Sequence, residues 1–144
     1  YMAHLFPKAT ITSVELNSET FKYLKRNISE FKLGDRVTAV NADSVKYIQE
    51  KQETADFAFF DPPWGGRNYK KNKHMMLYLS DIPIYDVINT TFRENVASAV
   101  VLKVPYNFDI DLFKKNVKNV VSMTDISNKY GKIFFRLILI LRHN

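Results

Sequence analysis

The sequence predicts an α/β fold with a mostly parallel sheet and one antiparallel strand near its carboxyl end. Short β-branched or apolar runs alternate with segments whose apolar residues recur at helical spacing, which is the pattern of a parallel sheet. The run at 56–60 is rich in apolar residues, as strands covered on both faces are. The final strand, turn and strand, over 120–141, add an antiparallel pair to this sheet.

Turn-forming and capping residues set the expected bounds of each element. Asn17 and Ser18 form a helix cap, and Gly34 ends the helix that follows. Pro105 stops a buried strand, and Gly131 lies in the turn before the last strand. The expected strands are 10–16, 36–41, 56–60, 98–104, 120–126 and 133–141, and the expected helices follow 17–18 or lie at 44–51, 84–92 and 110–117.

Composition restricts the chemistry available to the chain. Lys and Arg total 21 against 15 acidic residues, a net charge of +6 that favours a polyanionic partner. The absence of cysteine excludes disulfides, a thiol nucleophile and cysteine-ligated metals. The three histidines, His4, His74 and His143, are far apart in sequence, so no metal is expected. The longest apolar run, Ile133–Leu141, is interrupted by Arg136 and is too short to span a membrane.

The 144 residues are expected to form one domain whose first, central strand lies upstream of Tyr1. Dinucleotide-binding α/β folds begin with a strand and a glycine-rich turn, and none of the four glycines opens such a turn. Without an upstream strand, the strands at 10–16 and 56–60 would expose unpaired edges. The alternative is that these two strands pair directly.

The four residues Asp61, Pro62, Pro63 and Trp64 carry the strongest chemical signal. They follow a buried strand at its carboxyl end, where open α/β sheets bind ligands. The prolines keep the backbone extended, so the carboxylate and nearby carbonyls can accept hydrogen bonds from an exocyclic amine of a nucleobase. The indole offers a face for base stacking. The alternative is a strand-terminating turn with a core tryptophan.

Two further acids end the strands that precede this turn. Glu15 stands directly before a helix cap, the position that binds ribose hydroxyls of an adenosine-containing cofactor. Asp43 can accept a hydrogen bond from an adenine amine, and as a simple helix cap it would look the same. With Asp61, these acids end three successive strands, which is the layout of an S-adenosylmethionine site.

The stretch 61–69, Asp-Pro-Pro-Trp-Gly-Gly-Arg-Asn-Tyr, resembles the signature of the trimethylguanosine synthase family, Asp/Ser-Pro-Pro-Trp-Gly-Gly followed two residues later by tyrosine. The likeness extends through Val-Glu-Leu-Asn at 14–17, Asn-Ala-Asp at 41–43 and Val-Pro-Tyr-Asn-Phe-Asp-Ile-Asp at 104–111. It implies a Rossmann-like S-adenosylmethionine-dependent methyltransferase fold. It also implies methyl transfer from S-adenosylmethionine to the exocyclic N2 amine of a 7-methylguanosine RNA cap.

The resemblance also implies a role for each matching residue. The catalytic residues would be Asp61, Pro62 and Trp64; the cofactor-binding residues Glu15, Asp43 and Asp61; the substrate-binding residues Trp64, Arg67, Tyr69 and Asn107. The phosphate-binding arginine of the family is Tyr106 here, and Arg67, which replaces a proline of the family pattern, would be its substitute. The lysines that follow Arg67 either face the cap phosphates or form an ordinary solvated loop.

Other targets remain open from the sequence. Enzymes that methylate the exocyclic amine of adenine share Asp-Pro-Pro-Trp, although Gly65, Gly66 and Tyr69 match the cap enzymes. A guanine amine in other RNA is another target. A non-catalytic cap-binding module is the alternative from a different class, and it has no reason to keep three strand-end acids.

Overall fold

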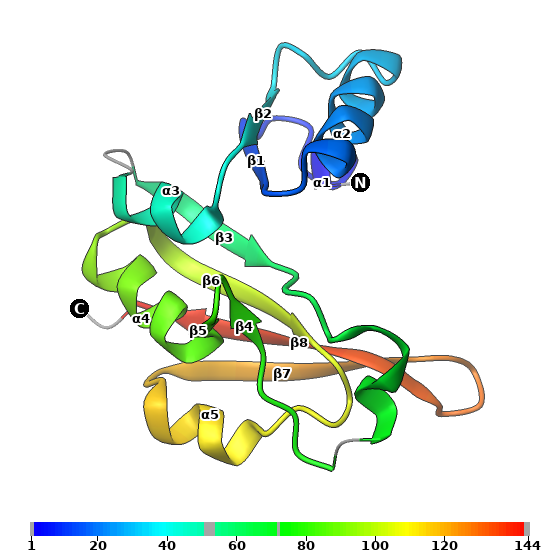
Figure 1. Ribbon diagram of the computed structural model, residues 1–144, viewed down its shortest axis with the longest axis vertical. Helices are drawn as coiled ribbons and strands as arrows, with labels where there is room; N and C mark the ends of the chain where they lie inside the picture. The colour runs from blue at the N-terminus through cyan, green and yellow to red at the C-terminus, as the bar shows by residue number, and fades with distance from the viewer. Residues whose placement is uncertain (1, 51–53, 72, 143–144) are drawn as a thin grey trace. The chain divides into compact units, whose positions relative to one another are not determined.

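The computed structural model describes residues 2–50, 54–71 and 73–142. The chain divides into two compact units, of which unit 1 ends at Tyr47 and unit 2 begins at Ile48. Figure 1 shows the elements along the chain. One helix, α3 (Ser44–Glu50), runs across this boundary.

Unit 1 is a small parallel α/β unit. Its elements are α1 (Met2–Leu5), β1 (Ile11–Glu15), α2 (Ser18–Glu30) and β2 (Val37–Asn41). The two strands are parallel and in register from Ile11 opposite Val37 to Glu15 opposite Asn41. The Arg36 guanidinium donates to the carbonyl of Ala3 at 3.1 Å, which ties the first helix to the start of β2.

Helix α2 begins as the sequence predicts and ends earlier. The Asn17 side chain accepts hydrogen bonds from the amides of Glu19 and Thr20, which confirms the predicted cap. The prediction that Gly34 ends the helix is wrong, because Lys32 takes the left-handed conformation at φ 53°. Its amide bonds the Ser29 carbonyl and the Leu33 amide bonds the Ile28 carbonyl, as in a Schellman motif.

The four-stranded sheet of unit 2 confirms the predicted mixed topology. The strand order is β3 (Ala55–Phe60), β6 (Ala97–Val104), β8 (Ile133–Leu141) and β7 (Val120–Ser127). Strands β3 and β6 are parallel, and β8 is antiparallel to both of its neighbours. Figure 1 shows β8 lying between β6 and β7. The reversal follows from the turn that ends at Lys132, where Gly131 takes φ 79°.

One face of this sheet forms the core of unit 2. Fully buried side chains alternate along the strands, as period-2 burial requires. Helix α4 (Ile84–Arg93) packs against β6 and α5 (Ile110–Asn116). The described residues with no exposed surface are Ile84, Ile88, Thr91, Ala97, Val100, Leu102, Val104, Phe113, Ile138 and Ile140.

The opposite face is open at β3, which corrects the prediction of a strand buried on both sides. Phe60 pairs with Leu102 and is buried, whereas Phe59 points to the other face and is 42% exposed. The apolar composition of the run is therefore due to alternation between one core face and one accessible face, and not to double burial.

The segment between β3 and α4 has more structure than the loop that the sequence predicts. It contains the 3-10 helix η1 (Gly66–Lys71) and a hairpin of β4 (Tyr78–Leu79) and β5 (Ile82–Pro83). Ser80 and Asp81 both have positive φ angles, as a two-residue type I′ turn requires. Met75 and Leu77 are buried, so this segment contributes to the core.

Strands β1 and β3 belong to different sheets. Strand β1 pairs with β2, and β3 pairs with β6. Within the described residues no strand pairs with the second edge of either one, so the alternative of direct pairing is not observed. A central strand upstream of Tyr1, within a single domain, stays a prediction. No helix in the described part of the chain is long and apolar enough to cross a membrane.

Candidate active site

The turn after β3 places an acid beside a lysine of the neighbouring strand. Asp61 follows Phe60, whose burial and pairing with Leu102 hold the end of the strand. The Asp61 Oδ2 atom lies 2.7 Å from the Lys103 Nζ atom, with side chains 46% and 27% exposed respectively. Pro62, the next residue, is buried. The predicted catalytic carboxylate is therefore held in place by a cation.

Trp64 is half-buried and contacts two side chains. The Lys103 Nζ atom lies 5.4 Å from the centroid of the indole, within the range of a cation–π interaction. The ring of Tyr69 meets the indole edge-on, with the centroids 5.4 Å apart and an interplanar angle of 65°. The Nε1 atom of Trp64 is buried and has no acceptor among the described residues. Asp61, Trp64 and Tyr69 thus lie together in unit 2.

Lys103 is the residue of this cluster that the sequence analysis missed. It is the only charged residue in the strand Ala97–Val104, next to the predicted catalytic strand. Its Nζ atom also lies 5.2 Å from the ring centroid of Phe135, on the antiparallel neighbour β8. A lone charge in an apolar strand was the available signal, but its partners lie on other strands and could not be read from sequence spacing.

Asn107 joins the loop after β6 to the segment after β3. Its Nδ2 atom donates to the Tyr69 carbonyl at 2.8 Å. The Met75 amide donates to the Asn107 carbonyl at 2.9 Å, and the Asp109 amide donates to the Met75 carbonyl at 2.8 Å. Phe108 is buried and forms a parallel bridge with Met75. The predicted substrate-binding residues Tyr69 and Asn107 are therefore joined by a direct hydrogen bond.

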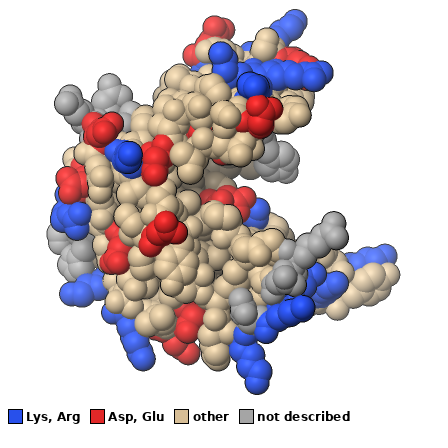
Figure 2. Space-filling model, viewed as in Figure 1, with Lys and Arg blue, Asp and Glu red and all other residues tan. Residues whose placement is uncertain are grey.

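The structure also locates the departures from the expected phosphate-binding pattern. Tyr106, at the position of the missing arginine, is 41% exposed. The backbone of Arg67 is part of η1, while its side chain lies outside the described residues. The Lys70 Nζ atom lies 5.9 Å from the Tyr69 ring. On the face shown in Figure 2, Lys and Arg form several separate groups with acidic residues between them.

Glu15 and Asp43 lie at the carboxyl ends of two neighbouring parallel strands of unit 1. Glu15 is the last residue of β1, is half-buried, and accepts a hydrogen bond on Oε1 from the Asn17 amide at 2.7 Å. The Asn41 side chain donates to the Glu15 carbonyl at 2.7 Å, which fixes the end of β1 against β2. Asp43 accepts from the Val45 amide at 2.8 Å and caps α3. Both acids thus also have local structural roles.

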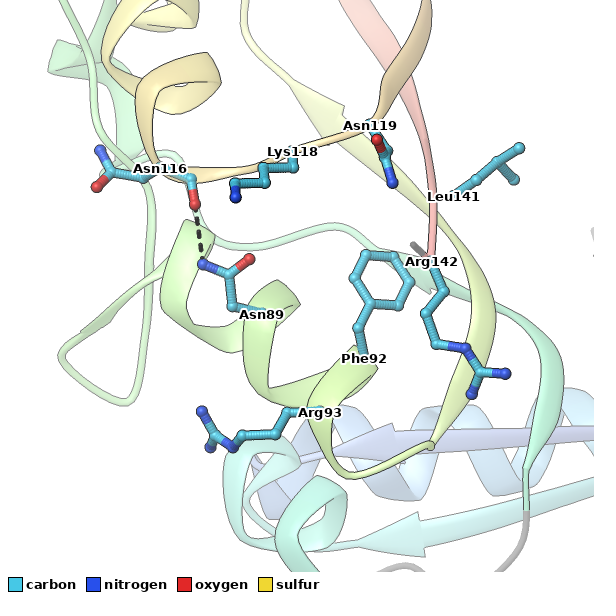
Figure 3. Close-up of a pocket in the computed structure, with 8 residues that line it drawn as sticks. All are labelled: Asn89, Phe92, Arg93, Asn116, Lys118, Asn119, Leu141 and Arg142. Atoms are coloured by element: carbon cyan, nitrogen blue, oxygen red, sulfur yellow. Dashed lines mark hydrogen bonds between the residues drawn. The ribbon is translucent and has the colours of Figure 1, made fainter. Parts of the chain in front are cut away.

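A hollow of about 410 Å³ lies elsewhere in unit 2 (Figure 3). Its wall is near the start of β6, because the Arg142 amide donates to the Ser98 carbonyl at 3.0 Å. The turn at Asp61 follows the opposite end of the parallel strands. No predicted site residue and no carboxylate is among the lining residues Asn89, Phe92, Arg93, Asn116, Lys118, Asn119, Leu141 and Arg142. The hollow is therefore not the predicted site. Among the described residues, no group of three His, Cys, Asp or Glu side chains is arranged to hold a metal.

Comparison with known proteins gives one family match and one curated relative. A family model described as RNA cap guanine-N2 methyltransferase matches residues 1–134. An uncharacterized protein of Acanthamoeba polyphaga mimivirus, L320, is 34% identical over 110 residues, which make up 76% of this chain and 43% of that protein. The chain therefore spans less than half the length of this relative.

Solved structures share the fold at low sequence identity. The METTL16 methyltransferase domain has a TM-score of 0.64 and 15% identity, over 94% of this chain and 51% of that chain. TrmK of M. capricolum, solved with S-adenosyl-homocysteine, has a TM-score of 0.64 and 11% identity, over 100% of this chain and 56% of that chain. At these identities the likeness shows the fold alone.

These comparisons confirm the predicted fold class and family. The described sheets, with parallel strands and one antiparallel strand, are those of a Rossmann-like methyltransferase. Family and fold together indicate S-adenosylmethionine as the cofactor, as the sequence predicts. The family match covers unit 1 and unit 2 up to residue 134, and it includes all eight predicted site residues. The chain belongs to the RNA cap guanine-N2 methyltransferase family.

Proposed function

We propose that this protein transfers a methyl group from S-adenosylmethionine to the exocyclic N2 amine of a 7-methylguanosine RNA cap. The observation that carries the proposal is the turn after β3. It places the Asp61 carboxylate and the Trp64 indole around one ammonium group, in a chain of the cap guanine-N2 methyltransferase family. Capped RNA is accordingly the proposed partner.

In this proposal, Asp61 and Pro62 hold the amine and Trp64 holds the base. A carboxylate oxygen and a backbone carbonyl accept the two amine hydrogens, so the nitrogen lone pair faces the methyl donor. A 7-methylated guanine carries a positive charge, and an indole attracts it by stacking and by cation–π contact. Tyr69 contacts the indole edge-on, and Asn107 donates a hydrogen bond to the Tyr69 carbonyl. Tyr69 is proposed to lie near the cap phosphates.

Glu15 and Asp43, at the carboxyl ends of the strands of unit 1, are proposed to bind the methyl donor. Glu15 uses Oε1 for the Asn17 amide, and a carboxylate has about four acceptor positions, which leaves capacity for ribose hydroxyls. Asp43 is proposed to face the adenine amine, and Asp61 to stand near the transferred methyl. S-adenosylmethionine supplies a methyl group on a sulfonium centre, so a neutral amine can attack without a strong base. The proton leaves after transfer.

A second candidate is methylation of an exocyclic amine on a neutral base, adenine or unmethylated guanine, in other RNA or DNA. The observation that favours it is the Lys103 ammonium group at the Trp64 face, because a second cation is disfavoured there. The stacking and amine-holding roles of Trp64 and Asp61 would be the same for a neutral base.

A methyl-transfer assay separates these candidates. The protein is incubated with radiolabelled S-adenosylmethionine and one RNA sequence carrying a 7-methylguanosine cap, an unmethylated guanosine cap or no cap. The cap proposal predicts label in the 7-methylguanosine cap, with less in the unmethylated cap and none in uncapped RNA. Equal label in all three RNAs would support the second candidate. Cap binding without transfer in any RNA would indicate a binding module.

A further inference from the structure

Lys103 occupies a position where a charge needs specific compensation. Its neighbours along β6 include Leu102 and Val104, which have no exposed surface, and its side chain is only 27% exposed. A partly buried ammonium group is stable only with partners that replace water. Here the partners are one carboxylate oxygen, at 2.7 Å, and the rings of Trp64 and Phe135. Two of these three partners, Asp61 and Trp64, belong to the proposed substrate site.

We propose that Lys103 sets how strongly the site discriminates between a positively charged and a neutral nucleobase. Its ammonium group weakens the preference of Trp64 for a cationic base over a neutral one. This inference rests on the proposed function in one respect, namely that the base stacks on Trp64. It assigns a specificity-determining role to a residue that the family motif does not include.

The physical argument is competition between like charges. The indole attracts a cation through the negative face of its ring, within about 6 Å of the ring centroid. The Lys103 Nζ atom already lies within this range, at 5.4 Å. A 7-methylated guanine stacked on the same ring adds a second positive charge near the first, and the two repel in a partly desolvated site. A neutral guanine stacks without this repulsion. Lys103 therefore reduces the difference in affinity between the two bases.

The ion pair with Asp61 keeps the ammonium group in place. The Lys103 Nζ atom lies 2.7 Å from Asp61 Oδ2 and pairs with that oxygen. In this proposal, Oδ1 is therefore the carboxylate oxygen that accepts a hydrogen bond from the amine of the base. Lys103 thus acts on the same two residues that are proposed to hold the substrate, and it acts by charge rather than by contact with the reacting atoms.

Another role for Lys103 would be to bind cap phosphates in place of the missing arginine at Tyr106. The two roles differ in their dependence on phosphate. A phosphate anchor affects methylated and unmethylated nucleotides alike and has no effect on nucleosides. A residue that responds to the charge of the base changes the ratio of affinities for methylated and unmethylated bases, with or without phosphates.

The test uses the intrinsic fluorescence of Trp64, the single tryptophan of the protein. The protein is titrated with 7-methylguanosine, guanosine and the triphosphates of both. The variants are Lys103→Met, Lys103→Arg and Lys114→Met, the last being a control on the exposed side of α5. The double variant Asp61→Asn with Lys103→Met removes both charges, so the unbalanced carboxylate cannot explain the result. Melting curves of all variants report folding.

We expect Lys103→Met to raise the ratio of 7-methylguanosine affinity to guanosine affinity by about tenfold, with Lys103→Arg and the control near the wild-type ratio. The double variant should also exceed the wild-type ratio. An unchanged ratio in Lys103→Met, with normal binding of both nucleosides, would overturn this inference and leave the proposed function standing. Weaker binding of both triphosphates with unchanged nucleoside binding would assign Lys103 to the phosphates. No change of fluorescence with any ligand would overturn both proposals.

Discussion

Replacement of Trp64 by alanine tests the base site and its structural alternative together. The side chain is half-buried and contacts Tyr69 and Lys103. Loss of an edge-on aromatic pair costs about 0.5–1.5 kcal/mol of folding free energy, and loss of a partly exposed cation–π contact about 0.5–1 kcal/mol. The expected loss of stability from these two contacts is therefore about 1–2.5 kcal/mol. A fully buried core tryptophan would cost about 3–5 kcal/mol.

The same substitution should weaken substrate binding by an amount comparable with its effect on stability. Loss of one stacked base costs about 1–3 kcal/mol of binding free energy, or about 5- to 150-fold in affinity. Trp64→Phe should keep part of this affinity, since a smaller ring still stacks. The part of the preference for 7-methylguanosine that comes from cation–π attraction should shrink in Trp64→Ala, because this attraction requires the ring.

Two measurements on the same samples check these expectations. Calorimetric titration with 7-methylguanosine triphosphate and with guanosine triphosphate gives the preference without need of a fluorophore. Thermal melting gives the stability change, which we expect to lower the melting temperature by about 3–10 °C. A larger drop, together with an unchanged preference in the folded fraction, would show that Trp64 is a core residue and would remove the main support for a cap site.

Three further predictions address two proposed site residues, Asp61 and Glu15, and the end of α2. Asp61→Ala should lower turnover far more than it raises the Michaelis constant for cap, because orientation of the amine acts on the chemical step; steady-state kinetics with normal turnover would reduce Asp61 to a binding role. Glu15→Ala should weaken S-adenosylmethionine binding by about 1.5–3 kcal/mol, roughly ten- to a hundredfold by calorimetry, and unchanged affinity would remove Glu15 from the cofactor site. Lys32→Gly should stabilise the protein by up to about 1 kcal/mol in urea unfolding, because Lys32 holds a left-handed φ. The matched variant Gly34→Ala, with no atom within 4 Å of the added Cβ, should stabilise it by about 0.4–1 kcal/mol, whereas a destabilised Gly34→Ala would contradict the assignment of the helix end.

Six of the eight described strands were predicted well from the sequence, because each of the six is a short apolar run between strong turn signals. The last strand, Ile133–Leu141, has the predicted bounds, and the strand that precedes Pro105 begins one residue earlier than predicted. The cap at Asn17 was also readable, since side chain and amides lie within three residues of each other. Local interactions of this kind are encoded in neighbouring residues and can be recognised there.

The features that the sequence analysis missed depend on unusual backbone angles or on partners from other strands. The hairpin turn at Ser80 and Asp81 uses positive φ angles without glycine, so its sequence has no typical signal. The end of α2 at Lys32 was misplaced for the same reason. Lys103 contacts Asp61, 42 residues away, because β3 and β6 are neighbours in the sheet. Such a contact follows from strand order and register, which the sequence does not specify residue by residue.

The bridge between Met75 and Phe108 also affects the entropic cost of ligand binding at the proposed site. It anchors the far end of the segment that begins at Asp61, whose near end is fixed by β3, so the segment is a loop closed at both ends. Closure removes conformational entropy from a loop during folding. Ligands that order a loose segment lose affinity to that ordering, whereas a segment already restrained imposes a smaller entropic cost. The preorganisation of Trp64 thus originates partly in two backbone hydrogen bonds made by a methionine eleven positions further along the chain.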